Sequence, residues 1–168
     1  DAPAFFAHSG SISSVTLHQM NTLPHVFNAT LADNANSYLY NLALHWFTGI
    51  SGNGIGDYML LSKIMAITTL IALFFLCRSF FGKSAFTSIA VLLLTVDIDF
   101  IGMSHEIRAY SMGMLFVTLA ALFFFRYLSR EEKPVDLLLT GLFSAAAILS
   151  HFLSLYIIVV FLVVLVVR

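Results

Sequence analysis

Charge is the scarcest feature of this chain, and its scarcity excludes an ordinary soluble domain. Asp, Glu, Lys and Arg make up only 10% of the residues, whereas soluble domains carry about a quarter. Hydrophobic residues make up 60%, and 17 of the 168 residues are Phe. A globule of this length could not bury so much apolar surface, so the composition indicates an integral membrane protein.

Cysteine and basic residues are also few, and this limits the partners. Cys77 is the single cysteine, so the chain cannot form an internal disulfide. The net charge is −1, and proteins that bind nucleic acid normally carry a basic patch. We therefore expect membrane lipids as partners, and we exclude nucleic acid.

Four apolar stretches predict helices that cross the membrane, each of which needs about 20 residues. They cover residues 64–77, 84–96, 109–125 and 137–167. The first is long enough if its helix runs from about Met59 to Phe81, and the second could reach Met103 if two acids are tolerated. The last fits two shorter helices that meet near residues 150–151 better than one helix, although a single tilted helix also fits.

Lys and Arg fall in alternating clusters, which indicates the orientation in the membrane. None precedes Lys63, and most of the later ones lie in 78–83 and 126–136. Because basic residues favour the cytoplasmic side, we expect these two segments inside the cell. Residues 1–57 and 97–108 are then expected outside.

These patterns predict an all-α, polytopic transmembrane helix bundle over residues 58–168. An extracytoplasmic loop with short amphipathic helices is expected over residues 1–57. One of these helices would begin near Ser13 or Ser14. Because the chain begins at Asp1 rather than Met, we expect a fragment of a larger membrane domain, preceded by another helix.

A second amphipathic helix is predicted from Asn36 or Ser37 through Phe47. Asn41 and His45 are expected to face away from its apolar side. That apolar side would comprise Leu39, Leu42, Ala43, Trp46 and Phe47. Aromatic residues favour the headgroup region, and those expected there are Tyr38, Tyr40 and Trp46.

The densest group of charges lies between two apolar stretches. It comprises Asp97, Asp99, Glu106 and Arg108. Charge at the edge of a membrane-spanning segment is costly unless it meets water, a partner or a substrate. This segment therefore predicts either a functional site or a heavily solvated loop.

Several short elements, taken in order, resemble a known family. They are Asp1, the helix near 33–42, the segment 77–83, Ser104-His105-Glu106-Ile107-Arg108-Ala109-Tyr110, and the segment 147–152. Their order and spacing resemble the amino-terminal part of the polytopic C-type glycosyltransferases. That group contains the protein mannosyltransferases and the lipid A aminoarabinose transferases.

The resemblance implies a glycosyltransferase of the plasma membrane with an extracytoplasmic active site. Such enzymes pass a sugar from a polyprenyl-phosphate carrier to a hydroxyl of a protein, lipid or glycan, here by inverting displacement with a carboxylate base. Asp1 is the implied base and Asp33 the reserve. The chain departs from the family pattern, because Ala2 replaces the usual second acid and Asn36-Ser37 replace prolines.

Arg108 suits the donor phosphate because its planar guanidinium binds oxyanions bidentately. The alternative is a structural ion pair with Glu106, which would need a loop there, since residues two apart on a helix point in different directions. Tyr110 completes the acid-x-Arg-x-Tyr element. Lys63 is either a second phosphate ligand or an interfacial side chain, and His151 either caps a turn or lines the active site.

No metal site is predicted, because the six His residues match no zinc signature. A divalent cation could bind His105 and Glu106 with Asp97 or Asp99 only if the fold gathers them, so no cofactor is assigned. A transporter or flippase and a non-catalytic scaffold are the alternative functions. Transporters place such charges near the midplane, often within repeats, whereas these charges lie at one end.

Overall fold

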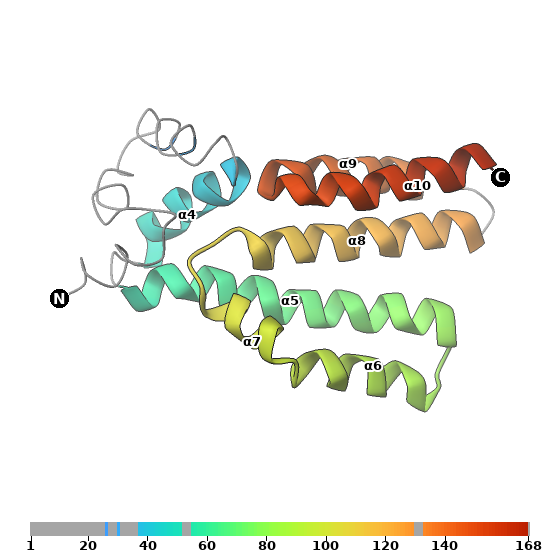
Figure 1. The fold of residues 1–168 in the computed structure, drawn as a ribbon, viewed down its shortest axis with the longest axis horizontal. Helices are drawn as coiled ribbons and strands as arrows, with labels where there is room; N and C mark the ends of the chain where they lie inside the picture. The colour runs from blue at the N-terminus through green and yellow to red at the C-terminus, as the bar shows by residue number, and fades with distance from the viewer. Residues whose placement is uncertain (1–25, 27–29, 31–36, 52–54, 130–132, 168) are drawn as a thin grey trace.

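The computed structural model describes residues 26, 30, 37–51, 55–129 and 133–167. Within these ranges every regular element is a helix, which confirms the predicted all-α class (Figure 1). The elements are α4 (Tyr38–Ser51), α5 (Ile55–Phe81), α6 (Ala85–Thr95), α7 (Ile98–His105), α8 (Tyr110–Ser129), α9 (Pro134–Ser150), the short 3-10 helix η1 (Phe152–Ser154) and α10 (Leu155–Val167).

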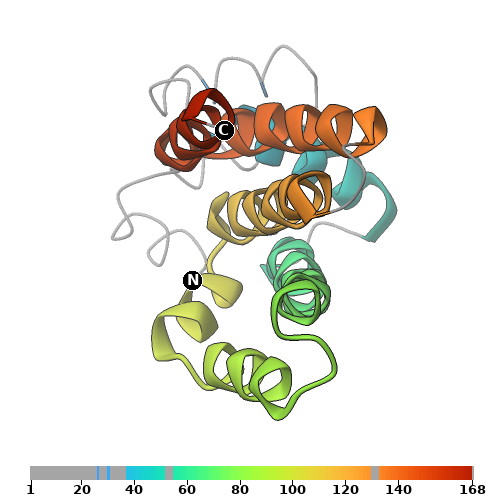
Figure 2. The ribbon, with the colours of Figure 1, turned by 90° about the vertical axis from the view of Figure 1, so that its right-hand side faces the viewer.

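The long helices lie side by side, and α4 sits across one end of them (Figures 1 and 2). Helix α8 is central because it packs against both α5 and α9, while α6 packs against α5. The end that carries α4, the loop before α8 and the turn after α9 is called the site end. The opposite end, where α5 and α8 finish, is called the basic end.

In the part of the chain that the structure describes, two helices are long and apolar enough to cross a membrane, Gly56–Phe81 and Tyr110–Ser129. The pair α6 and α7 adds a third crossing if it counts as one span bent by 57°. Helix α9 and the segment Phe152–Val167 are shorter apolar helices. The structure therefore confirms the predicted class, a bundle of helices with several candidate membrane spans. Helix α5 ends at Phe81, as the sequence indicated.

The break between α6 and α7 and the break after α9 each occur at a polar side chain that caps the next helix. The Asp97 carboxylate accepts a hydrogen bond from the Phe100 N–H at 2.7 Å and begins α7. The backbone of His151 is extended, which ends α9, and its Nδ1 accepts from the Leu153 N–H at 3.3 Å. Residues 137–167 thus form two helices, the arrangement that the sequence favoured.

The buried core that holds α4 in place lies at the site end. It comprises Val26, Tyr40, Leu44, Leu61, Ala109 and Met112. These residues come from α4, α5, the loop before α8 and α8 itself, together with the isolated residue 26. Their burial therefore fixes α4 against the membrane-spanning helices close to that loop.

The predicted faces of α4 are wrong in part. Tyr40 and Asn41 are completely buried, whereas Trp46, expected on the apolar side, is 67% exposed. The Tyr40 hydroxyl hydrogen-bonds Ser62 Oγ at 2.9 Å, and Asn41 Nδ2 donates to Thr30 Oγ1 at 3.1 Å. These distant partners pair the Tyr40 hydroxyl and the Asn41 Nδ2, while Asn41 Oδ1 is buried without a hydrogen bond among the described residues. The helix expected near residues 13–20 lies outside the described residues.

Candidate active site

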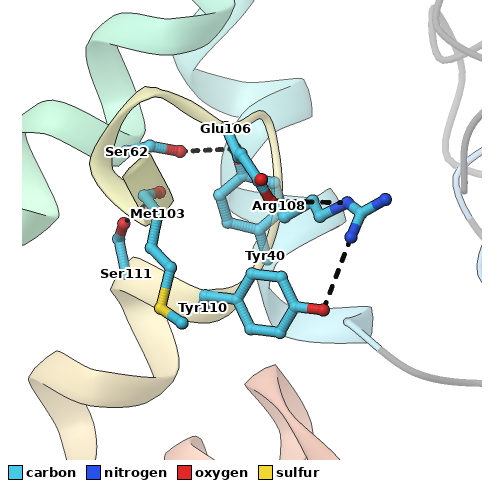
Figure 3. A network of polar contacts seen from close by, with 7 residues as sticks. All are labelled: Tyr40, Ser62, Met103, Glu106, Arg108, Tyr110 and Ser111. Carbon is cyan, nitrogen blue, oxygen red and sulfur yellow. Dashed lines mark hydrogen bonds and ion pairs between the residues drawn. The ribbon is translucent and has the colours of Figure 1, made fainter. Parts of the chain in front are cut away.

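The loop between α7 and α8 carries the acid-x-Arg-x-Tyr element and is held firmly on both sides. Helix α7 ends at His105, and the backbone of the next residue, Glu106, is extended. The Ser111 hydroxyl donates to the Met103 carbonyl at 3.1 Å and ties the loop's two ends together (Figure 3). Ala109 and Met112 anchor the loop in the site-end core. The intervening side chains are therefore presented from a fixed backbone.

Glu106 and Arg108 form the ion pair that a loop permits. Arg108 Nε lies 3.7 Å from Glu106 Oε2, and the two side chains are 31% and 50% exposed respectively. A pair this exposed stabilises the fold by only about 0–1 kcal/mol. The ion pair matters mainly for position, because it holds the Arg108 guanidinium at the surface of the loop.

Tyr110 lies on the other side of the same guanidinium. Arg108 Nη1 donates to the Tyr110 hydroxyl at 3.5 Å, and the guanidinium carbon is 5.8 Å from the centre of the ring. Both side chains point to the same side of the loop (Figure 3). The Arg108 guanidinium is therefore held between the Glu106 carboxylate and the Tyr110 hydroxyl, and these two contacts fix its orientation.

His151 joins this group from a segment distant in sequence. Its ring centre lies 4.9 Å from that of Tyr110, with 36° between the planes. Glu106, Arg108, Tyr110 and His151 are called the contact group from here on. The structure brings together four of the predicted site residues, and His151 both caps its turn and contacts this group.

Gly113 permits that approach and was missed in the sequence. A Cβ built at Gly113 would lie 3.1 Å from the Cβ of His151, which is tighter than ordinary contact between packed carbon atoms. The sequence did carry a signal, because a glycine inside a predicted helix often marks a place where another segment packs closely. Gly113 therefore sets how closely the turn after α9 can approach α8.

The remaining predicted site residues are placed as follows. Lys63 lies near the start of α5 at the site end and is half-buried. Among the described residues, Lys63 takes no part in the ion pair, hydrogen bond and ring contact that join the contact group. The two predicted catalytic carboxylates, Asp1 and Asp33, lie outside the described residues.

The hypothesis of a cation bound by His105 and its acidic neighbours is not supported by the fold. Within the described ranges, no three His, Cys, Asp or Glu side chains gather as a metal site would require. Asp97 is engaged in capping α7. His105 Nδ1 lies 2.9 Å from the Ile101 carbonyl of its own helix, so its ring is engaged locally.

Comparison with known families identifies the family that the chain resembles. Residues 35–168 match the family model described as dolichyl-phosphate-mannose-protein mannosyltransferase. The matched range includes the whole contact group and confirms the resemblance found in the sequence. Comparisons with curated proteins and with solved structures found no match.

Proposed function

The chain belongs to the dolichyl-phosphate-mannose-protein mannosyltransferase family, and we propose that its contact group binds the phosphate of the sugar donor. Membership makes it a glycosyltransferase that depends on a lipid-phosphate sugar, and the family name implies a dolichyl-phosphate-mannose donor and a protein acceptor. For this chain we propose a polyprenyl-phosphate-linked sugar as donor. The acceptor is a hydroxyl of a protein, with a lipid or glycan as the other acceptor classes.

The reaction is an inverting displacement at the anomeric carbon. The acceptor oxygen forms a bond to that carbon while the bond to the phosphate oxygen breaks, and the polyprenyl phosphate leaves. The acceptor's proton passes to a carboxylate, which must lie within about 2.6–3.2 Å of the hydroxyl. We assign this base to Asp1, with Asp33 as the reserve.

Arg108 stabilises the departing phosphate in this scheme. A guanidinium stays charged and can donate two parallel hydrogen bonds to a phosphate. The observation that carries the proposal is its placement, because Glu106 and Tyr110 flank it and fix its direction. His151 positions Tyr110 through ring contact, and Lys63 on α5 is a second phosphate ligand.

The orientation follows from the basic end. Arg78 and Arg126 occupy the last turns of α5 and α8, which finish at the same end of the bundle (Figure 1). Because basic residues favour the cytoplasm, the site end faces outward in the plasma membrane. Residues 1–57 then form the extracytoplasmic loop, and residues 58–168 belong to the transmembrane domain.

Asp1→Asn in the full-length protein tests this function. Purified protein receives a radiolabelled polyprenyl-phosphate mannose, and donor binding and transfer to an acceptor peptide are measured separately. We expect transfer to fall by at least about 100-fold, as for loss of a general base, while donor binding is retained. Asp99→Asn, a substitution on exposed α7, is the matched control. Unchanged transfer in Asp1→Asn would remove Asp1 from the proposed role.

A further inference from the structure

A cavity with a partly polar lining lies at the basic end, between the final turns of α5 and α8. Its volume is about 620 Å³, and it is partly open to the surroundings. Two arginines and two serines line it, Arg78, Ser79, Arg126 and Ser129. Because the contact group lies at the site end, this cavity belongs to a different part of the bundle (Figure 1).

The two arginines differ in how they are held. Arg126 Nε lies 3.6 Å from Asp136 Oδ1, and the Asp136 side chain is only 6% exposed. The Arg126 guanidinium also lies 5.3 Å from the ring centre of Phe123. In the part of the chain that the structure describes, Arg126 Nε is buried without a hydrogen bond. Arg126 is therefore fixed in place, with its fork at the cavity wall.

Arg78 adds a positive charge that the buried acid does not balance. It is exposed, and no ion pair involves it among the described residues. Among the described residues, Asp136 is the carboxylate that pairs with Arg126, so the charge of Arg78 is not neutralised by this ion pair. Ser129 lines the cavity beside them, whereas the Ser79 hydroxyl already donates to the Leu76 carbonyl at 2.7 Å. The two guanidiniums and Ser129 therefore supply the donors that a phosphate needs.

The rest of the lining is apolar. Phe75, Leu122 and Phe125 line the same cavity, and each lies nearer the middle of its helix than the arginine that shares that helix. Helices α5 and α8 are the two candidate membrane spans, so their shared end lies at the level of lipid headgroups. A polar rim above an apolar wall matches a phospholipid, whereas free phosphate would leave the apolar wall uncovered.

We propose that this cavity binds the headgroup phosphate of an anionic phospholipid, with Arg78 and Arg126 as its ligands and the acyl chain against Phe75 and Leu122. Basic pockets between membrane helices on the cytoplasmic side are suited to such headgroups. The lipid would join the ends of α5 and α8 at the face opposite the sugar donor. This binding does not require the proposed transfer chemistry.

The test uses the full-length protein in nanodiscs of phosphatidylcholine that contain a minority of phosphatidylglycerol. Native mass spectrometry after release measures the ratio of the two lipids that remain bound. Arg78→Gln should lower the preference for phosphatidylglycerol about fivefold, because one basic residue contributes roughly 1 kcal/mol to anionic lipid binding. Lys83→Gln is the matched control, since it removes one charge at the same end but Lys83 does not line the cavity.

The outcomes distinguish a specific lipid site in the cavity from general electrostatic attraction of anionic lipid to the basic end. Retained preference in Lys83→Gln with loss in Arg78→Gln supports the proposal. An unchanged preference in Arg78→Gln, or an equal loss in both variants, would overturn it. A thermal shift that inorganic phosphate gives to the wild type but not to Arg78→Gln, without any phosphatidylglycerol preference, would assign the cavity to free phosphate instead. Sugar transfer by Arg78→Gln in neutral detergent should equal that of the wild type.

Discussion

Tyr40 shows how a single polar side chain secures the site end. Its ring belongs to the core that joins α4 to α5 and α8, and its hydroxyl bonds Ser62 at 2.9 Å. Burial raises the pKa of Tyr40 from 10.0 to about 12, against a smaller lowering by the Ser62 hydrogen bond. The phenol therefore stays neutral well above physiological pH.

This pKa shift predicts a loss of stability at high pH. Because the folded-state pKa exceeds the unfolded one, the stabilisation is complete below pH 10.0 and is lost as the pH rises towards about 12. Tyr40→Phe should lower the free energy of unfolding by about 1 kcal/mol at neutral pH, since it leaves the Ser62 hydroxyl unpaired. It should also lose less stability than the wild type at alkaline pH. Thermal unfolding in detergent at a series of pH values measures both, and parallel alkaline curves would contradict the account.

The residues of the site were predictable to different degrees. Glu106, Arg108 and Tyr110 stand out because charge is rare beside apolar stretches, and the ion pair required the loop that the structure contains. The contact of His151 with Tyr110 depends on the packing of α9 against α8. No local pattern in the sequence reports such a contact.

At the scale of elements, the close contact between α8 and the turn after α9 positions the site. Gly113 on α8 leaves room for the backbone-attached Cβ of His151, which cannot rotate away. Ser154, in the same turn, also lies near this point, with its Oγ 3.9 Å from a Cβ built at Gly113. The distance between these two elements therefore sets the position of the ring beside Tyr110.

Gly113→Ala should move that turn and impair the site. Alanine favours a helix by about 1 kcal/mol over glycine, while overpacking costs roughly 1–3 kcal/mol. We expect a small net change in the melting temperature but a weakening of donor binding by about tenfold or less. Gly141→Ala is the control, because a Cβ there meets nothing within 4 Å. Equal donor affinity in both variants would show that the turn does not influence the site.

Helix boundaries were predictable where apolar length and polar breaks determine them, as in α5 and at His151. The faces of α4 were not. Helical periodicity placed Trp46 inside and Asn41 outside, yet Asn41 is buried because Thr30 accepts its hydrogen bond. A tertiary partner of this kind offsets part of the cost of burying a polar side chain, and in Asn41 it pairs Nδ2 while Oδ1 stays without a hydrogen bond among the described residues.

For the whole molecule, the alternation of helices places the contact group and the basic residues at opposite ends. Helices α5 and α8 both run from the site end to the basic end, and α6 and α7, which come between them in chain order, lead back to the site end (Figure 1). The α9–α10 hairpin repeats the alternation. The proposed extracytoplasmic orientation requires this separation of the contact group from the arginines at the ends of α5 and α8.

This topology predicts which residues an impermeant thiol reagent can reach from outside intact cells. In a Cys77→Ala background, Leu153→Cys should react, whereas Val167→Cys should react only after permeabilisation. Both native side chains are exposed, at 58% and 81% respectively. Lys83→Cys is the control for the inner side. Reaction of positions 153 and 167 from the same side would mean that the last two helices do not form a crossing hairpin.

Arg108 is proposed to hold the phosphate of the sugar donor, and the affinity for that donor tests this role most directly. Equilibrium binding of a labelled polyprenyl-phosphate mannose to the full-length protein should weaken about 10–100-fold in Arg108→Ala, as expected for loss of a hydrogen bond to a charged group. Arg108→Lys should recover part of the loss, because it restores the charge but not the bidentate fork. Lys133→Gln, at the basic end, should bind as the wild type does. Wild-type donor affinity in Arg108→Ala would contradict the account.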